Sequence, residues 1–116
     1  MSESFDAYQA ERSRLTDLVL EKGSQTTKRF FNLDSAIYRD GALSARTKEL
    51  LGLVASTVLR CDDCIRYHLD QSVKSGWTDE EIREALDVAL VIGGSITIPH
   101  LRRAYGDLEQ LAEESE

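Results

Sequence analysis

The sequence predicts an all-α protein, with about six helices in a single domain that spans residues 1–116. A chain of 116 residues has the length of one compact domain. One proline and seven glycines provide few of the breaks that a many-stranded protein needs. Between these breaks, apolar residues recur every three or four positions, which is the period of an α-helix. Together these observations favour a bundle of helices over a sheet.

We expect the first two helices over residues 6–21 and 24–40. A glycine follows each segment, Gly23 after the first and Gly41 after the second, and glycine is a common stop signal. Their apolar faces are marked by Leu15, Leu18 and Val19 in the first segment, and by Phe30, Leu33 and Ile37 in the second.

A third helix is predicted from Ser44, a favourable N-cap residue, to about residue 59. Residues 50–59 are apolar nearly all round, which is typical of a central helix. A fourth helix is predicted from about Cys61 to Gly76. Its packing face repeats at four-residue steps through Ile65, Leu69 and Val73.

The fifth helix has the clearest start signal, because Thr78 and Glu81 fit the S/T-x-x-E capping box. Residues 85–92 are apolar apart from Asp87, so we expect this helix to be largely buried.

A double glycine, Gly93-Gly94, interrupts the helical pattern before the last segment. Proline disfavours helical geometry in the residue before it, so Pro99 predicts that Ile98 lies outside the helix. We therefore expect the sixth helix over about residues 99–112, and a short extended stretch at residues 96–98 is open.

Charge and hydropathy exclude several functions. The net charge is −7, and residues 61–116 carry thirteen acidic and five basic side chains, which would repel nucleic acid. No run approaches the ~18 apolar residues of a membrane span. The first residues lack the basic and apolar pattern of a signal peptide, so we expect a reducing, cytoplasmic location.

The chemistry-bearing residues lie in one stretch that holds both cysteines of the chain, Cys61 and Cys64, followed by His68. On a helix that turns about 100° per residue, these three side chains share one face. A thiolate attacks electrophiles, a nearby imidazole accepts the thiol proton, and a second thiol closes a disulfide. The pattern favours a two-cysteine redox centre at a helix N-terminus.

Two further interpretations of the cysteine pair stay open. Asp62 and Asp63 lie between the cysteines, and their negative charge opposes thiolate formation. A zinc site would use Cys61, Cys64 and His68, with His100 or a carboxylate as the fourth ligand. An inert pair of buried cysteines is the second interpretation, and we expect His100 itself to be structural.

Glu49 is the next candidate, because it opens the apolar run of the third predicted helix. It shares a stripe with Leu53 and Ser56, and a partly desolvated carboxylate at that place suits a proton relay. The alternative is a solvated glutamate in the first turn.

The order Glu49-x₁₁-Cys61-x-x-Cys64-x₃-His68 resembles the AhpD-like branch of the carboxymuconolactone decarboxylase family. The segments Leu43–Leu50 and Gly76–Leu86, and the double glycine, are similar to that family as well. The resemblance covers about residues 35–110 and implies an all-α fold that assembles into trimers or hexamers.

The resemblance also implies an activity, the reduction of hydroperoxides without a metal or cofactor. Cys64 would attack the peroxide to form a sulfenic acid, and Cys61 would resolve it to a disulfide. His68 and Glu49 would form the proton relay. A dithiol partner, of the lipoyl or thioredoxin type, would reduce the disulfide again.

This chain departs from the family pattern at Asp63, where the best-studied members carry a further relay histidine. A weak peroxidase or a protein-disulfide reductase is therefore an alternative activity. A structural oligomer without turnover and a cysteine-independent lyase that uses Glu49 and His68 also stay open.

Overall fold

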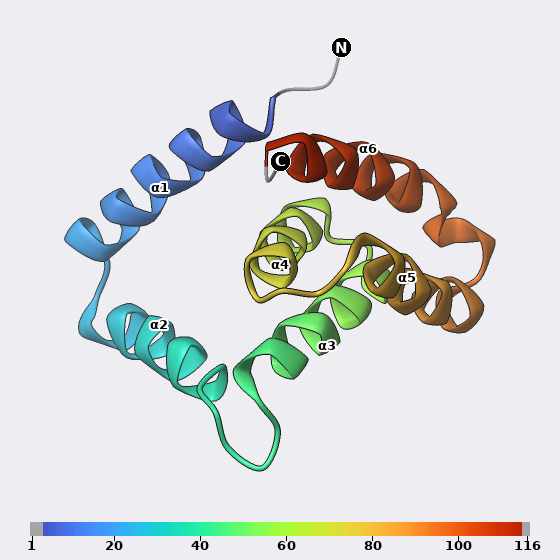
Figure 1. Ribbon diagram of the computed structural model, residues 1–116. Helices are drawn as coiled ribbons and strands as arrows, with labels where there is room; N and C mark the ends of the chain where they lie inside the picture. The colour runs from blue at the N-terminus through green and yellow to red at the C-terminus, as the bar shows by residue number, and fades with distance from the viewer. Residues whose placement is uncertain (1–3, 115–116) are drawn as a thin grey trace. The chain divides into compact units, whose positions relative to one another are not determined.

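The computed structural model describes residues 4–114 and consists of α-helices with one 3₁₀ turn (Figure 1). Among the described residues there is no strand, so the all-α prediction of about six helices is confirmed. In chain order the elements are α1 (Phe5–Lys22), α2 (Gln25–Ile37), α3 (Ala45–Val58), α4 (Asp62–Lys74), α5 (Asp79–Gly93), η1 (Ser95–Thr97) and α6 (Ile98–Glu114).

The chain divides into two compact units, Met1–Arg39 and Asp40–Glu116. The first unit contains α1 and α2, and the second contains α3 to α6. The assignment of all 116 residues to a single domain stays a prediction. None of the described helices combines the length and hydropathy needed to cross a membrane.

Serine caps begin both helices of the first unit. The Oγ atoms of Ser4 and Ser24 accept hydrogen bonds from backbone N–H groups three residues later, at 3.1 and 3.2 Å. Such bonds satisfy backbone donors that have no partner within the helix. The predicted apolar face of α2 is exposed, since α2 has no buried residue.

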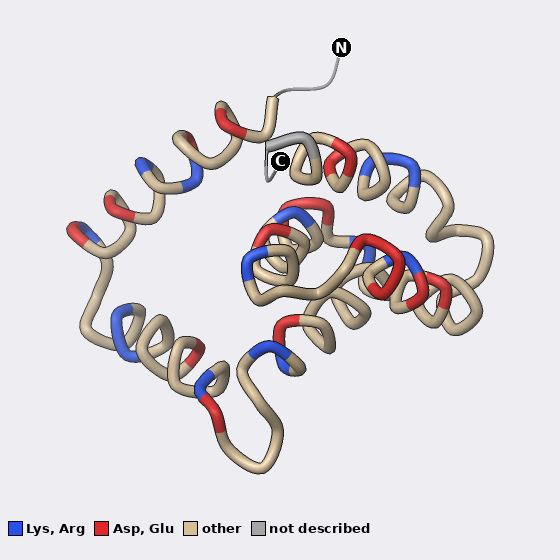
Figure 2. The backbone as a smooth tube through the Cα atoms, viewed as in Figure 1, with Lys and Arg blue, Asp and Glu red and all other residues tan. Residues whose placement is uncertain are grey.

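In the second unit, α3 and α5 also begin at predicted caps. Ser44 accepts from the N–H of Thr47 at 3.2 Å, and Thr78 and Glu81 form both bonds of the capping box. The N–H of Thr78 donates to the Glu81 carboxylate and thereby lowers the pKa of that carboxyl group. Figure 2 shows acidic residues gathered at this helix start, where the helix dipole favours them.

The core of the second unit forms where α3 packs against α4 and α5, and α6 packs against α4 (Figure 1). Its fully buried apolar side chains are Leu53, Ile65, Leu69, Ile82, Leu86, Ala89 and Ala104. The predicted packing face of α4 is confirmed for Ile65 and Leu69, whereas Val73 is half-buried.

The prediction that α3 is a central helix is confirmed, since α3 packs against both α4 and α5. The prediction that α5 is largely buried is wrong for the single chain, because only Ile82, Leu86 and Ala89 of α5 are buried. Leu59, which caps α3, is 76% exposed, and Val91 of α5 is 80% exposed. Leu51, Val88 and Ile92 are also exposed. The four helices of this unit are too few to cover every face of α3 and α5, so the apolar residues of their outer faces remain uncovered.

Residues 96–98 do not form the extended stretch that the sequence left open, and the prediction that Ile98 lies outside the helix is wrong. Residues 95–97 form the 3₁₀ turn η1, held by the N–H and Oγ1 of Thr97, which both donate to the carbonyl of Gly94. The turn leads directly into α6, and Ile98 is helical with φ −57° and ψ −45°. Pro99 is tolerated because it lies in the first turn of α6, where an N–H would have no acceptor within the helix.

Candidate redox site

A tight turn between α3 and α4 positions the cysteine pair. The N–H of Cys61 donates to the carbonyl of Ser56 at 3.1 Å, and the N–H of Arg60 donates to Thr57 at 3.0 Å. This is the Schellman pattern of a helix C-terminus. Arg60 has a φ of 62°, in the left-handed region that glycine usually occupies. The turn ends α3 and makes Cys61 the N-cap of α4.

Cys61 and Cys64 are joined by a disulfide at the N-terminus of α4, with their Cα atoms 5.3 Å apart. The backbone N–H of Cys64 donates to the Sγ of Cys61 at 3.3 Å. Cys64 is exposed and Cys61 is half-buried. A helix N-terminus stabilises negative charge on a sulfur, so in the reduced protein this position favours a thiolate at Cys61.

A buried carboxylate–imidazole pair lies close to the cysteines. His68 stands one helical turn after Cys64 on α4, and its Nδ1 is 3.3 Å from Oε2 of Glu49 on α3. Glu49 is 6% exposed and His68 is 9% exposed. The structure therefore brings the two residues together, and Glu49 is buried rather than solvated.

Gly52 of α3 provides the space for the His68 ring. A Cβ atom at Gly52 would lie 2.7 to 2.9 Å from three atoms of the imidazole, closer than real Cβ contacts. The ring of Tyr67 meets that of His68 edge-on, with centroids 5.0 Å apart. Sequence reasoning missed Gly52. The available signal was a glycine inside an apolar helix, where it destabilises by about 1 kcal/mol relative to alanine.

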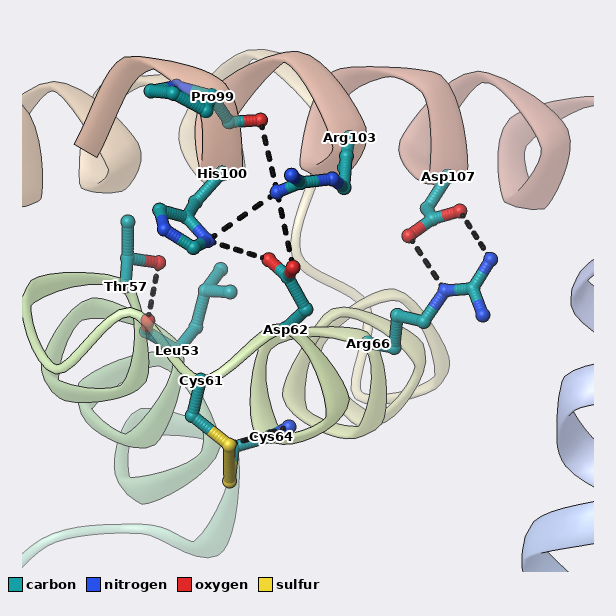
Figure 3. A network of polar contacts seen from close by, with 10 residues as sticks. All are labelled: Leu53, Thr57, Cys61, Asp62, Cys64, Arg66, Pro99, His100, Arg103 and Asp107. Carbon is teal, nitrogen blue, oxygen red and sulfur yellow. Dashed lines mark hydrogen bonds and ion pairs between the residues drawn. A yellow bond between two sulfur atoms is a disulfide. The ribbon is translucent and has the colours of Figure 1, made fainter. Parts of the chain in front are cut away.

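A second carboxylate–imidazole pair connects the motif to α6 (Figure 3). Oδ1 of Asp62 lies 2.7 Å from Nδ1 of His100, and Oδ2 lies 3.0 Å from Nη1 of Arg103. His100, expected to be structural, thus contacts a residue that lies between the two cysteines. Sequence reasoning missed this network, because 38 residues separate Asp62 from His100 and no local pattern connects them.

A further ion pair joins α4 to α6 away from the cysteines. Nε and Nη2 of Arg66 donate to the two carboxylate oxygens of Asp107, at 3.0 and 3.2 Å (Figure 3). Asp107 is buried and Arg66 is half-buried. The two helices are therefore fastened independently of the Asp62 network.

The zinc interpretation requires at least three ligands in one place. Among the described residues, no three histidine, cysteine, aspartate or glutamate side chains are grouped so that they could hold a metal ion. His100, the candidate fourth ligand, is paired with Asp62.

An exposed disulfide at a helix N-terminus, beside a buried carboxylate–histidine pair, supports a redox role. The chain belongs to the carboxymuconolactone decarboxylase family, whose model matches residues 24–106.

Two solved structures of this family are similar to the chain. A Thermotoga maritima protein, described as a candidate for an antioxidative response, has a TM-score of 0.90 and 63% identity, over 94% of this chain and 92% of that one. A Legionella pneumophila protein has a TM-score of 0.80 and 29% identity, over 97% of both chains. The uncharacterized protein 4 in the cox locus of Paracoccus denitrificans is 30% identical over 89 residues, which are 77% of this chain and 80% of that protein.

Proposed function

We propose that this protein is a thiol-dependent enzyme that reduces hydroperoxides through a Cys61–Cys64 dithiol–disulfide cycle. The observation that carries the proposal is the exposed cysteine pair at the start of α4, one turn from the buried pair of His68 and Glu49. The description of the Thermotoga protein as a candidate for an antioxidative response agrees with it. No metal or cofactor is needed for this chemistry.

The first step oxidises Cys64. His68, held by Glu49, accepts the thiol proton through a water, and the thiolate attacks the hydroperoxide. An S–O bond forms, the O–O bond breaks, and the alkoxide takes the proton and leaves as an alcohol. Cys64 becomes a sulfenic acid. Its exposed position, in contrast to half-buried Cys61, gives the peroxide access.

The second step forms the disulfide. The thiolate of Cys61 attacks the Cys64 sulfur, the S–S bond forms and the S–O bond breaks. The leaving hydroxide takes up the proton that the Cys61 thiol gave up, and water is released. The N-cap position of Cys61 favours its thiolate. In sum, one hydroperoxide takes two electrons and two protons from the two thiols and yields one alcohol and one water.

The cycle closes when a dithiol partner reduces the disulfide by exchange, as a lipoyl or thioredoxin-type protein does in a reducing cytoplasm. A second candidate function, a protein-disulfide reductase, uses the same exchange in the opposite direction. The exposure of Cys64, which lets a partner's disulfide reach the sulfur, favours this candidate over a structural oligomer without turnover.

We also propose that the chain forms a homo-oligomer, a trimer or a hexamer. Large apolar side chains are exposed on several helices, among them Phe30 of α2 and Val91 and Ile92 of α5. So many large apolar side chains left in water are unfavourable, and a second copy of the chain would cover some of them. Sedimentation at micromolar concentration tests this, and a monomer alone would contradict it.

The test of the proposed activity is a count of free thiols and an intact mass, before and after one equivalent of cumene hydroperoxide. We expect both thiols to disappear and the mass to fall by two hydrogens. In Cys61→Ser we expect the mass to rise by one oxygen, since the sulfenic acid has no resolving thiol. In Cys64→Ser we expect no fast reaction. Two thiols that persist in the wild-type protein would remove hydroperoxides as substrates.

A further inference from the structure

The first turn of α4 contains a carboxylate that should hinder the oxidation of the neighbouring thiols. Asp62 follows Cys61 directly, and a negative charge beside a thiol disfavours the thiolate. In the structure, however, the Asp62 carboxylate is directed toward α6. Figure 3 shows the two sulfurs on the opposite side of this turn.

We propose that His100 and Arg103 are positioning residues for the Cys61–Cys64 centre, and that they act by holding the carboxylate of Asp62. This inference rests on the proposed function, because it concerns the reactivity of the same thiols. It assigns a role in the redox centre to two residues of α6 that contact neither sulfur in the network of Figure 3.

Geometry and charge both support this role. Each oxygen of Asp62 has its own partner, His100 at 2.7 Å and Arg103 at 3.0 Å, so the carboxylate is held at two points. Arg103 carries a positive charge that offsets the charge of Asp62. The Asp62 side chain is 42% exposed, and solvent therefore limits the size of the effect.

Other charged groups lie close to the cysteines in the sequence or on the neighbouring helix. Asp63 adds a second negative charge on α4, and Glu49 of α3 is paired with His68. Arg60 lies in the turn before Cys61. Among the described residues, the ion pairs that reach Asp62 come from α6.

A purely structural role for the network is the competing explanation, and the molecule contains a control for it. Arg66 and Asp107 join the same two helices by two hydrogen bonds and are more buried than the Asp62 network. If His100 and Arg103 only fastened α4 to α6, loss of the Arg66–Asp107 pair would have the same consequence for the thiols.

The experiment measures the rate at which iodoacetamide alkylates the reduced protein at fixed pH, together with the reduction potential of the disulfide against glutathione. In the double variant H100Q/R103Q we expect alkylation to slow by about two- to fivefold, the effect of an exposed ion pair. We expect the control R66Q/D107N to alkylate at the wild-type rate. Thermal unfolding of each variant verifies that it is folded, and Arg103→Gln alone provides a milder change at an exposed side chain.

The Asp62→Asn background tests whether the effect passes through Asp62. In this background we expect H100Q/R103Q to change the logarithm of the alkylation rate by at most half as much as it does in the wild-type protein. The reason is that the carboxylate held by His100 and Arg103 is absent. The proposal is overturned if H100Q/R103Q slows alkylation equally in the wild-type and Asp62→Asn backgrounds. It is also overturned if the control R66Q/D107N slows alkylation as much as H100Q/R103Q does, or if H100Q/R103Q is alkylated at the wild-type rate.

These outcomes are independent of peroxide reduction. Alkylation and the reduction potential report on the thiols without any peroxide, so a protein that fails to reduce cumene hydroperoxide still tests the role of His100 and Arg103. A protein that reduces the peroxide, with unchanged alkylation in H100Q/R103Q, would keep the proposed function and reject this inference.

Discussion

Two carboxylate–imidazole pairs flank the cysteines, and they differ in their surroundings. Glu49 and His68 are buried between α3 and α4, whereas Asp62 and His100 lie nearer the surface, between α4 and α6. Away from water, such a pair interacts strongly and can hold a proton acceptor in place. Near water, the interaction is screened and is limited to modest electrostatic tuning. We therefore expect the same two chemical groups to serve different roles according to their burial.

Neutralising the two carboxylates should have opposite effects, and this is the largest difference that we expect. Glu49→Gln removes the acceptor that holds His68 and should slow disulfide formation with cumene hydroperoxide by about 100-fold. Asp62→Asn removes a negative charge beside Cys61 and should accelerate thiol alkylation by about twofold. Rapid-quench thiol titration and iodoacetamide alkylation measure the two rates. If both variants slowed or both accelerated their reactions, the two carboxylates would not have the different roles that we assign to them.

Gly52→Ala tests whether the buried pair depends on the close approach of α3. The added Cβ would overlap the His68 ring, so we expect about 1–3 kcal/mol of destabilisation from overpacking and about tenfold slower disulfide formation. Gly106→Ala of α6 is the matched control, since a Cβ there meets no atom within 4 Å. It should be neutral or stabilise by up to about 1 kcal/mol. Urea unfolding measures both variants, and equal behaviour would refute the role of Gly52.

Added salt should change the effect of substitutions in the surface pair but not of those in the buried pair, and we expect this difference to be smaller than the previous ones. Charges near the surface are screened at about 1 M salt, where the Debye length falls to about 3 Å. The two- to fivefold effect of H100Q/R103Q on alkylation should therefore shrink toward one as salt is added, while the effect of Glu49→Gln on disulfide formation should persist. Each rate, measured across a salt series, checks this. If the effect of Glu49→Gln also vanished at high salt, the interaction between Glu49 and His68 would be screened by solvent, and burial would not distinguish the two pairs.

The sequence predicted the buried pair better than the surface pair, for a physical reason. Cys64 and His68 lie four residues apart on one helix, so local spacing places them on one face. The relay role of Glu49 beside them came from the resemblance to the family, because its own position left a solvated glutamate open. The contact of His100 with Asp62 depends on how α6 returns across α4, and no local pattern encodes that.

Elements with strong local signals were predicted correctly, and those that depend on tertiary context were not. The caps at Ser44 and Thr78 follow from side-chain hydrogen bonds within one turn. Ile98 is helical despite Pro99, since the 3₁₀ turn before it leads directly into α6. The exposed outer faces of α3 and α5 depend on how many neighbours each helix has, and periodicity does not report that.

We propose that the buried pair moves a proton during thiol oxidation, while the surface pair only adjusts charge. The most direct measurement is the rate of disulfide formation with cumene hydroperoxide in the wild-type protein, His68→Gln and His100→Gln. We expect a decrease of about 100-fold or more in His68→Gln and of no more than about fivefold in His100→Gln. Equal decreases in the two variants, or a wild-type rate in His68→Gln, would contradict the account.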